Sequence, residues 1–239
     1  MENQRVKVID SPMGTGKTTF AINYINSLPK EVRVIYITPF LDEVERIKQS
    51  CSDKKFVSPD KKMGKGSKRN HLLELIENER NIVSTHSLFS TMDDDMIDKL
   101  SRYNYILILD EVMNVLDKFD LWEELEIVND EYDETKREKT KKEIDMLVAK
   151  GAITIDADTG QIFWIDYDNQ WGKYETLRLL AEKNLLFLID GDIIVWTFPI
   201  DVFREGVFDE VYILTYQFDW QIQAAYYKYF PISTNAHIC

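Results

Sequence analysis

The stretch Ser11-Pro12-Met13-Gly14-Thr15-Gly16-Lys17-Thr18 stands between an apolar run and a run with helical spacing. The run before it, residues 6–9, is typical of a strand, and residues 18–28 are typical of a helix. Its two glycines let the backbone turn its N–H groups inward, and the start of the helix adds positive partial charge. This order of strand, loop and helix predicts a loop that binds phosphate groups.

Two side chains of this loop suit nucleotide chemistry. The Lys17 ammonium is expected to reach the β- and γ-phosphates, and the Thr18 hydroxyl to ligate Mg²⁺. Ser11 stands where such loops usually have glycine, but a small residue fits the opening position. The alternative is a chance Gly-Lys-Thr at the beginning of a helix. The residues expected to hold ATP are Ser11, Pro12, Met13, Gly14, Thr15, Gly16, Lys17, Thr18 and Thr19.

A pair of carboxylates, Asp110 and Glu111, follows the apolar run of residues 105–109. In an open α/β sheet, the carboxyl ends of the strands face the ligand. Asp110 is therefore expected to hold Mg²⁺ through water, and Glu111 to orient and deprotonate an attacking water. Taken alone, the pair would equally fit a helix N-cap followed by an acid in the first turn. With the loop upstream, Lys17 and Glu111 are the expected catalytic residues.

The order of the segments predicts one interrupted domain. Apolar runs alternate with helical segments in the first third, which is typical of a mostly parallel sheet covered on both faces. Residues 118–185 break this order with a charged helix, a hairpin signalled by Asp158-Thr159-Gly160, and a further helix. We expect this segment to be inserted between residues 1–117 and 186–239, which together form the nucleotide-binding domain. Residues 220–230 predict an aromatic helix that either packs on this sheet or forms a docking surface.

Charge and composition exclude several classes of protein. The 239 residues carry a net charge of −13, which argues against coating nucleic acid by bulk charge. Residues 48–69 nevertheless hold eight basic and two acidic side chains, and form either a solvated loop or a phosphate-contacting one. The most apolar stretch, residues 184–200, is cut by Asp190 and Asp192, so no membrane span is expected. Two cysteines fit a reducing cytoplasm, and the three histidines lack the spacing of a zinc site.

Four motifs together resemble the first motor domain of superfamily-2 helicases. They are SPMGTGKT (11–18), VIYITPFLDEVERI (34–47), NIVSTHSLF (81–89) and ILILDEV (106–112). The likeness is greatest to phage-encoded and herpesvirus-type origin-binding helicases; it covers residues 6–116 and resumes over residues 191–229. It implies a RecA-like fold of the P-loop NTPase type and ATP with Mg²⁺ as cofactors. It also implies hydrolysis of ATP to ADP and phosphate, coupled to nucleic-acid binding.

The resemblance also implies roles for individual residues. In that family the segments after the second and third strands contact the nucleic-acid backbone, and the matching positions here are Thr38, Pro39, Arg46, Thr85 and His86. A hydrogen-bonded structural role is the equal alternative for His86. Thr215 matches the Ser/Thr that couples nucleotide state to nucleic acid, and Thr197 is a rival for that role.

Such helicases have a second motor domain that supplies arginines to the γ-phosphate, and the last arginine of this chain is Arg204. We therefore expect low basal ATPase activity, weak binding of nucleic acid with single-stranded DNA as the working case, and dependence on a partner. That partner would be a second motor lobe, another copy or a different protein. The alternative function is a non-motor phage regulator that uses the lobe as a protein-binding scaffold. A P-loop nucleotide kinase is disfavoured by the Asp-Glu pair and by the lack of an arginine-rich lid.

Overall fold

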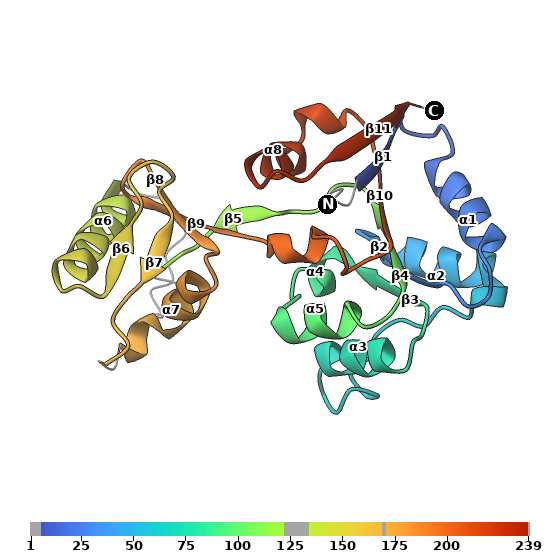
Figure 1. Ribbon diagram of the computed structural model, residues 1–239, viewed down its shortest axis with the longest axis horizontal. Coiled ribbons are helices and arrows are strands. Elements are labelled where there is room, and N and C mark those ends of the chain that lie inside the picture. The colour runs from blue at the N-terminus through green and yellow to red at the C-terminus, as the bar shows by residue number, and fades with distance from the viewer. Residues whose placement is uncertain (1–5, 122–133, 169–170, 239) are drawn as a thin grey trace. The chain divides into compact units, whose positions relative to one another are not determined.

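The computed structural model describes residues 6–121, 134–168 and 171–238 (Figure 1). The chain forms two compact units, of which the first comprises residues 1–115 and 199–239 and the second residues 116–198. Each unit has its own hydrophobic core. The sequence-based boundaries at residues 118 and 185 therefore move, because the two strands within residues 186–197 belong to the second unit.

The first unit is built on a six-stranded sheet with the order β11-β1-β10-β4-β2-β3, in which each pairing is parallel. This confirms the predicted mostly parallel α/β sheet. Its strands are β1 (Val6–Asp10), β2 (Arg33–Thr38), β3 (Ile82–Thr85), β4 (Tyr105–Asp110), β10 (Glu210–Thr215) and β11 (Thr234–Ile238). Its helices are α1 (Lys17–Ser27), α2 (Leu41–Ser50), α3 (Lys68–Glu77), α4 (His86–Phe89), α5 (Asp94–Leu100) and α8 (Ile222–Tyr229).

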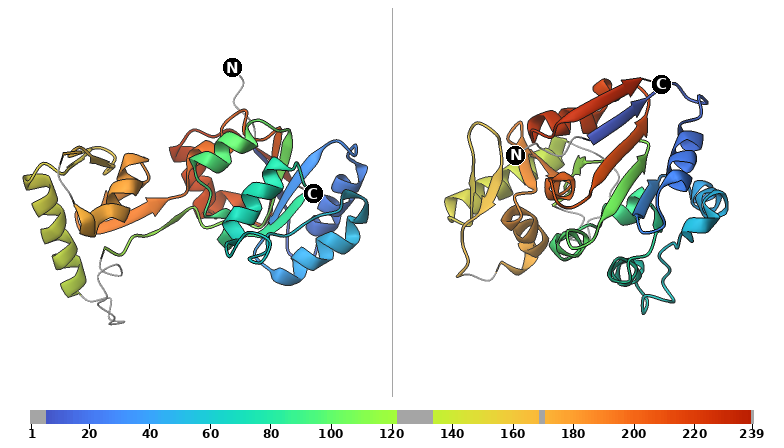
Figure 2. Two further views of the ribbon diagram at one scale, coloured as in Figure 1. Left: turned by 90° about the horizontal axis from the view of Figure 1, so that it is seen from below. Right: turned by 45° about the vertical axis from the view of Figure 1, so that its right-hand side comes forward.

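Helices cover both faces of this sheet, which is why its strands are apolar on both sides. All six residues of β4 are buried. One face packs against α1 and α2, with Ile106 and Ile108 of β4 in the same cluster as Ala21 and Val44. Figures 1 and 2 show α4, α5 and α8 on the opposite face. Burial of both faces removes the alternation of polar residues that a half-exposed strand would show.

The parallel arrangement gathers the strand ends at one edge of the sheet. Asp10 is in register with Thr215, Leu214 with Asp110, and Thr38 with Thr85. All of these residues stand at or next to the carboxyl ends of their strands. The residues that the motifs single out, although far apart in the sequence, therefore share one edge.

The second unit is antiparallel. It contains a three-stranded sheet of β5 (Leu116–Lys118), β9 (Ile193–Thr197) and β8 (Leu186–Ile189), and the hairpin of β6 (Ile153–Ile155) and β7 (Ile162–Trp164). The helices α6 (Glu134–Ala149) and α7 (Glu175–Glu182) supply Leu147 and Leu177 to its core. The hairpin lies where Asp158-Thr159-Gly160 predicts it. The start of the charged segment, residues 122–133, lies outside the described residues.

Among the described glycines of this unit, Gly160 is the one at which an added Cβ would collide with the backbone, so alanine there should destabilise the unit. Its φ is +73°, and an added Cβ would lie 2.3 Å from the Leu188 carbonyl oxygen. We expect Gly160→Ala to cost about 2 kcal/mol or more from backbone strain and overpacking. Hydrogen exchange of the β7 and β8 amides measures the loss. Gly151→Ala is the matched control, because Gly151 has a φ of +69° with nothing near its added Cβ; equal effects of the two variants would contradict the steric argument.

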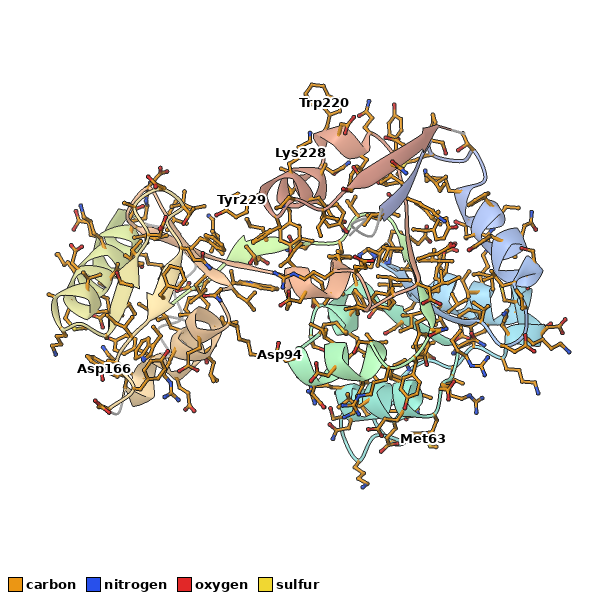
Figure 3. All side chains as sticks on the ribbon, viewed as in Figure 1. Met63, Asp94, Asp166, Trp220, Lys228 and Tyr229 are labelled. Atoms are coloured by element: carbon orange, nitrogen blue, oxygen red, sulfur yellow. The ribbon has the colours of Figure 1, made fainter. Side chains whose placement is uncertain are left out.

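The aromatic helix α8 packs on its own sheet. Tyr226 and Tyr227 are buried, and the Gln223 side chain accepts a hydrogen bond from the Met113 amide at 2.9 Å. Of the two alternatives for residues 220–230, Tyr226 and Tyr227 therefore follow the first, in which the helix packs against its own unit, since both side chains are buried. Trp220 lies outside this packing and is 88% exposed (Figure 3).

Candidate functional site

The loop between β1 and α1 has the conformation that its glycines predict. Gly14 has a φ of +77° and Gly16 a φ of +93°, both in the left-handed region that L side chains rarely adopt. Gly16 directly precedes α1, and its carbonyl accepts the Phe20 amide at 2.8 Å. The first turn of α1 therefore presents its free N–H groups at the end of the loop, where a phosphate would bind.

Ser11, the departure from the usual glycine, braces the loop. Its hydroxyl and the Thr15 hydroxyl are 2.8 Å apart, and Thr15 also donates to the Pro12 carbonyl at 2.7 Å. The Ser11 amide donates to the Thr215 carbonyl at 3.0 Å, which fixes the loop to the end of β10. Where such loops usually have a flexible glycine, this chain therefore has a serine whose side chain forms a hydrogen bond within the loop.

The Lys17 ammonium lies over its own loop. It donates to the Ser11 carbonyl at 2.8 Å and to the Pro12 carbonyl at 3.3 Å. These acceptors are uncharged carbonyls. A phosphate group bound beside the loop would attract the ammonium more strongly, because it carries the opposite charge.

Asp110 ends β4 and is 7% exposed. The pKa of its carboxyl is raised to about 6, chiefly by burial; the charges of Glu43 and Glu111 also raise it, and the Tyr36 hydroxyl and Lys17 lower it. A carboxylate in this environment gains from a nearby cation, since opposite charge favours the ionised form. Asp110 thus has the electrostatic character of a ligand for a divalent cation.

Glu111 leaves the strand in a left-handed conformation, with a φ of +69°. Its amide still donates to the Leu214 carbonyl at 2.8 Å, and its carboxylate accepts the Thr215 hydroxyl at 3.2 Å. A left-handed residue other than glycine costs about 1–2 kcal/mol, so neighbouring contacts must hold it. The two bonds to β10 fulfil that role and orient the carboxylate.

These groups line one cleft of about 310 Å³. It brings together the loop and the carboxylates as predicted, and adds Arg46 from α2. The lining residues are Met13, Gly14, Gly16, Lys17, Thr18, Thr19, Arg46, Asp110 and Glu111. Glycines with free N–H groups, a lysine, a hydroxyl and two carboxylates fit a nucleotide polyphosphate with a divalent cation.

Arg46 lines this cleft, whereas the resemblance implies a nucleic-acid contact. Its guanidinium pairs with Glu43 one turn earlier, at 3.2 and 3.4 Å to the two carboxylate oxygens. Both side chains are partly exposed, at 47% and 25%. An ion pair of this kind contributes about 0.5 kcal/mol or less, so Arg46 is readily released.

The other residues implied for nucleic acid lie at the same edge of the sheet. Thr38 is buried, and its hydroxyl accepts a hydrogen bond from the Phe40 amide at 3.4 Å. The side chains of Pro39 and Phe40 are exposed. Thr85 is half-buried at the end of β3. Burial lowers the pKa of His86, and its Nε2 atom has no hydrogen-bond partner among the described residues.

The two candidates for the coupling residue are separated by the fold. Thr215 stands in the first unit and contacts Glu111, whereas Thr197 stands in β9 of the second unit. The sequence could not distinguish them, because both end an apolar strand.

Three residues at the site were missed by sequence reasoning. The Asp10 carboxylate accepts the amides of Gln217 and Phe218, at 2.8 and 2.9 Å, and so holds the turn after β10. Its position at the end of the strand before the loop was a usable signal. Tyr36 lowers and Glu43 raises the pKa of Asp110. Nothing in the sequence around these two residues predicts that they lie close to Asp110.

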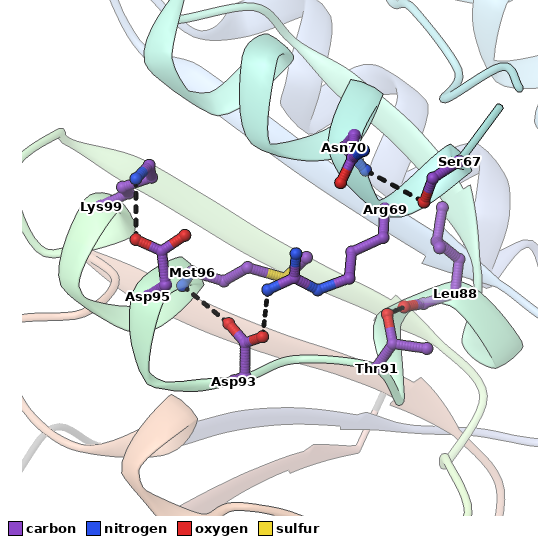
Figure 4. A network of polar contacts seen from close by, with 9 residues as sticks. All are labelled: Ser67, Arg69, Asn70, Leu88, Thr91, Asp93, Asp95, Met96 and Lys99. Carbon is purple, nitrogen blue, oxygen red and sulfur yellow. Dashed lines mark hydrogen bonds and ion pairs between the residues drawn. The ribbon is translucent and has the colours of Figure 1, made fainter. Parts of the chain in front are cut away.

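The basic segment of residues 48–69 is only partly available to a ligand. Lys48 pairs with Glu45, Lys54 donates to the carbonyls of Pro29 and Val32, and Arg69 pairs with Asp93, the N-cap residue of α5 (Figure 4). Four exposed lysines close to the start of α3 form no ion pair within the described part of the chain. They are Lys61, Lys62, Lys65 and Lys68.

Within the described ranges, the helices are too short or too polar to cross a membrane.

Comparison with known proteins gives two matching family models. The model for the DEAD/DEAH box helicase matches residues 1–149, and that for the YonV middle domain matches residues 136–196. A relative, the SPbeta prophage-derived uncharacterized protein YonV of Bacillus subtilis (strain 168), is 37% identical over 233 residues. The match covers 94% of this chain and 52% of that protein, so the chain spans about half the length of its relative.

Among solved structures, a chain described as truncated XPD matches with a TM-score of 0.39 and 11% identity, over 98% of this chain and 95% of the other. A likeness this low supports no argument about function. The DEAD/DEAH model, by contrast, matches more than half of the chain and spans both the loop at residues 11–18 and the Asp110-Glu111 pair. The first unit is thus a helicase motor-type domain, and the chain belongs to the DEAD/DEAH box helicase family.

Proposed function

We propose that the first unit binds ATP with Mg²⁺ and couples its hydrolysis to nucleic-acid binding. The observation that carries this proposal is the cleft in which the glycine loop, Lys17, Asp110 and Glu111 meet. The family supports ATP with a divalent metal, and the donor set of the cleft fits both groups.

The residues divide the work between binding and chemistry. Loop amides and the start of α1 hold the phosphates, and the Lys17 ammonium moves from the carbonyls of its loop onto them. Thr18 and Asp110 would hold Mg²⁺, which would offset negative charge on the phosphates. Glu111 accepts a proton from a water whose oxygen attacks the γ-phosphorus. The bond to the bridging oxygen breaks, which gives ADP and phosphate.

Coupling is proposed to run through β10. The Thr215 hydroxyl contacts Glu111, the Thr215 carbonyl holds the phosphate loop, and Asp10 holds the turn that follows. A change at the γ-phosphate that moves Glu111 would therefore move the end of β10 and its turn. Thr38, Pro39, Thr85 and His86, at the neighbouring strand ends, are the proposed nucleic-acid contacts.

The test is the rate of ATP hydrolysis by the purified chain with and without single-stranded DNA, together with its mass in solution. We expect slow turnover that DNA stimulates. A second lobe, another copy or another protein is the proposed source of faster turnover. ATP binding without stimulation by any nucleic acid would contradict the motor function. Partner binding that survives loss of Lys17 would instead support the alternative of a non-motor regulator.

Nucleic-acid binding is expected to depend steeply on salt through the four exposed lysines. Each phosphate neutralised on a single strand contributes about 0.7 to the slope of log affinity against log salt concentration. Replacing Lys61, Lys62, Lys65 and Lys68 with alanine should therefore flatten that slope, by up to about 3 if every lysine makes a contact. Fluorescence anisotropy with labelled single-stranded DNA measures this. The control replaces Lys139 and Lys141 of α6 instead, and the change in slope is compared per lysine removed. An unchanged slope in the loop variant would show that these lysines are only solvated.

A further inference from the structure

Arg46 is the guanidinium among the residues that line the cleft. It stands on the second turn of α2, and within the described part of the chain it forms an ion pair with Glu43 of the preceding turn. The loop that binds phosphates and the two carboxylates line the same cleft. The ATP chemistry proposed above gives no role to an arginine at this place with so weak an ion pair.

The electrostatics place this turn near the Asp110 side of the cleft. The charge of Glu43 raises the pKa of both Asp110 and the buried Tyr36, and the charge of Arg46 lowers that of Tyr36. Asp110 is the proposed ligand of Mg²⁺, and a metal held there would offset negative charge on the terminal phosphates. The guanidinium is therefore close to the region in which the terminal phosphate of ATP would lie.

We propose that Arg46 binds the terminal phosphate of ATP, and that Glu43 holds the guanidinium when no nucleotide is bound. This inference rests on the proposed function of the cleft. The Glu43 pair is partly exposed and weak, whereas a phosphate in the cleft offers two oxygens to the planar guanidinium. The phosphate therefore competes successfully for Arg46.

Two consequences follow for the motor. ADP lacks the terminal phosphate, so Arg46 makes the cleft discriminate between ATP and ADP from within a single lobe. Since α2 begins directly after Pro39 and Phe40, the contact also ties the nucleotide to a segment proposed to touch nucleic acid.

The test is calorimetry of three variants with a non-hydrolysable ATP analogue and with ADP, both with Mg²⁺. Arg46→Gln should lower affinity for the ATP analogue about tenfold and affinity for ADP less than twofold. Lys48→Gln is the matched control, because Lys48 stands on the same helix in a similar pair with Glu45 and does not line the cleft. Both affinities should stay unchanged in this control. Glu43→Gln frees Arg46 and should raise affinity for the ATP analogue about twofold to threefold.

The outcomes separate this inference from the function on which it rests. If wild-type protein binds neither nucleotide, the proposed function and the inference both fail. If it binds both nucleotides, and Arg46→Gln lowers both affinities equally or leaves them unchanged, the inference alone fails. A loss of single-stranded DNA affinity in Arg46→Gln with unchanged affinity for the ATP analogue would assign Arg46 to nucleic acid, as the family resemblance implies.

Discussion

Replacing Lys17 with alanine is expected to weaken ATP binding about 100-fold. The loop amides and the start of α1 remain, but the one charge that the loop places over the phosphates is lost. A charge-assisted hydrogen bond contributes about 1.5–3 kcal/mol, and one ammonium that contacts two phosphates lies at the upper end of that range. Isothermal titration calorimetry with ATP and Mg²⁺ measures the change.

The control for this experiment is Lys228→Ala, which removes the same charge from an exposed position on α8 of the same unit (Figure 3). The contacts that Lys17 makes in the free protein are to carbonyls of its own loop, so its loss should leave the fold intact by circular dichroism. Unchanged ATP affinity in a folded Lys17→Ala protein would overturn the assignment of the phosphate loop.

Replacing Glu111 with glutamine is expected to abolish hydrolysis while ATP binding stays within about twofold. The amide keeps the shape of the side chain and can still accept the Thr215 hydroxyl, but it cannot take a proton from water. Loss of a general base costs about 10²–10⁴ in rate. Because basal turnover is expected to be slow, single-turnover hydrolysis at saturating protein is the suitable measurement.

Thr215→Val is the companion variant. It keeps the carboxylate and removes the hydrogen bond that orients it, so hydrolysis should fall by less than in Glu111→Gln. The two variants separate the proton acceptor from the residue that positions it. Hydrolysis at the wild-type rate in Glu111→Gln would show that another group accepts the proton.

Several elements of the first unit were predictable because they depend on neighbours in the sequence. A strand, a glycine loop and a helix in direct succession leave few arrangements for residues 6–27, and the structure confirms the loop geometry through Gly14 and Gly16. The run of residues 105–109 is apolar enough to be a central strand, and in a parallel sheet its end must face the ligand edge. The positions of Asp110 and Glu111 follow from that rule.

Strand pairing between distant segments was not predictable. Residues 186–239 are expected to belong to the nucleotide-binding domain, yet β9 pairs antiparallel with β5, and β8 with β9, in the second unit. β11, which joins the edge of the parallel sheet, was missed because residues 234–238 are short and partly polar. The apolar residues of a strand predict that it is buried. They do not predict which strand it pairs with, because every residue other than proline offers the same backbone donor and acceptor.

The sequence by itself determined that the chain holds a phosphate loop before a helix and two carboxylates at the end of a buried strand. These are local properties, set by glycine conformation, helix start and hydrophobic runs. The tertiary structure alone decided that Thr215 rather than Thr197 meets Glu111, that Tyr226 and Tyr227 are core residues, and that Arg46 lines the cleft. Each of these facts depends on contacts between segments that are far apart in the sequence, and such contacts are fixed only when the side chains pack together in three dimensions.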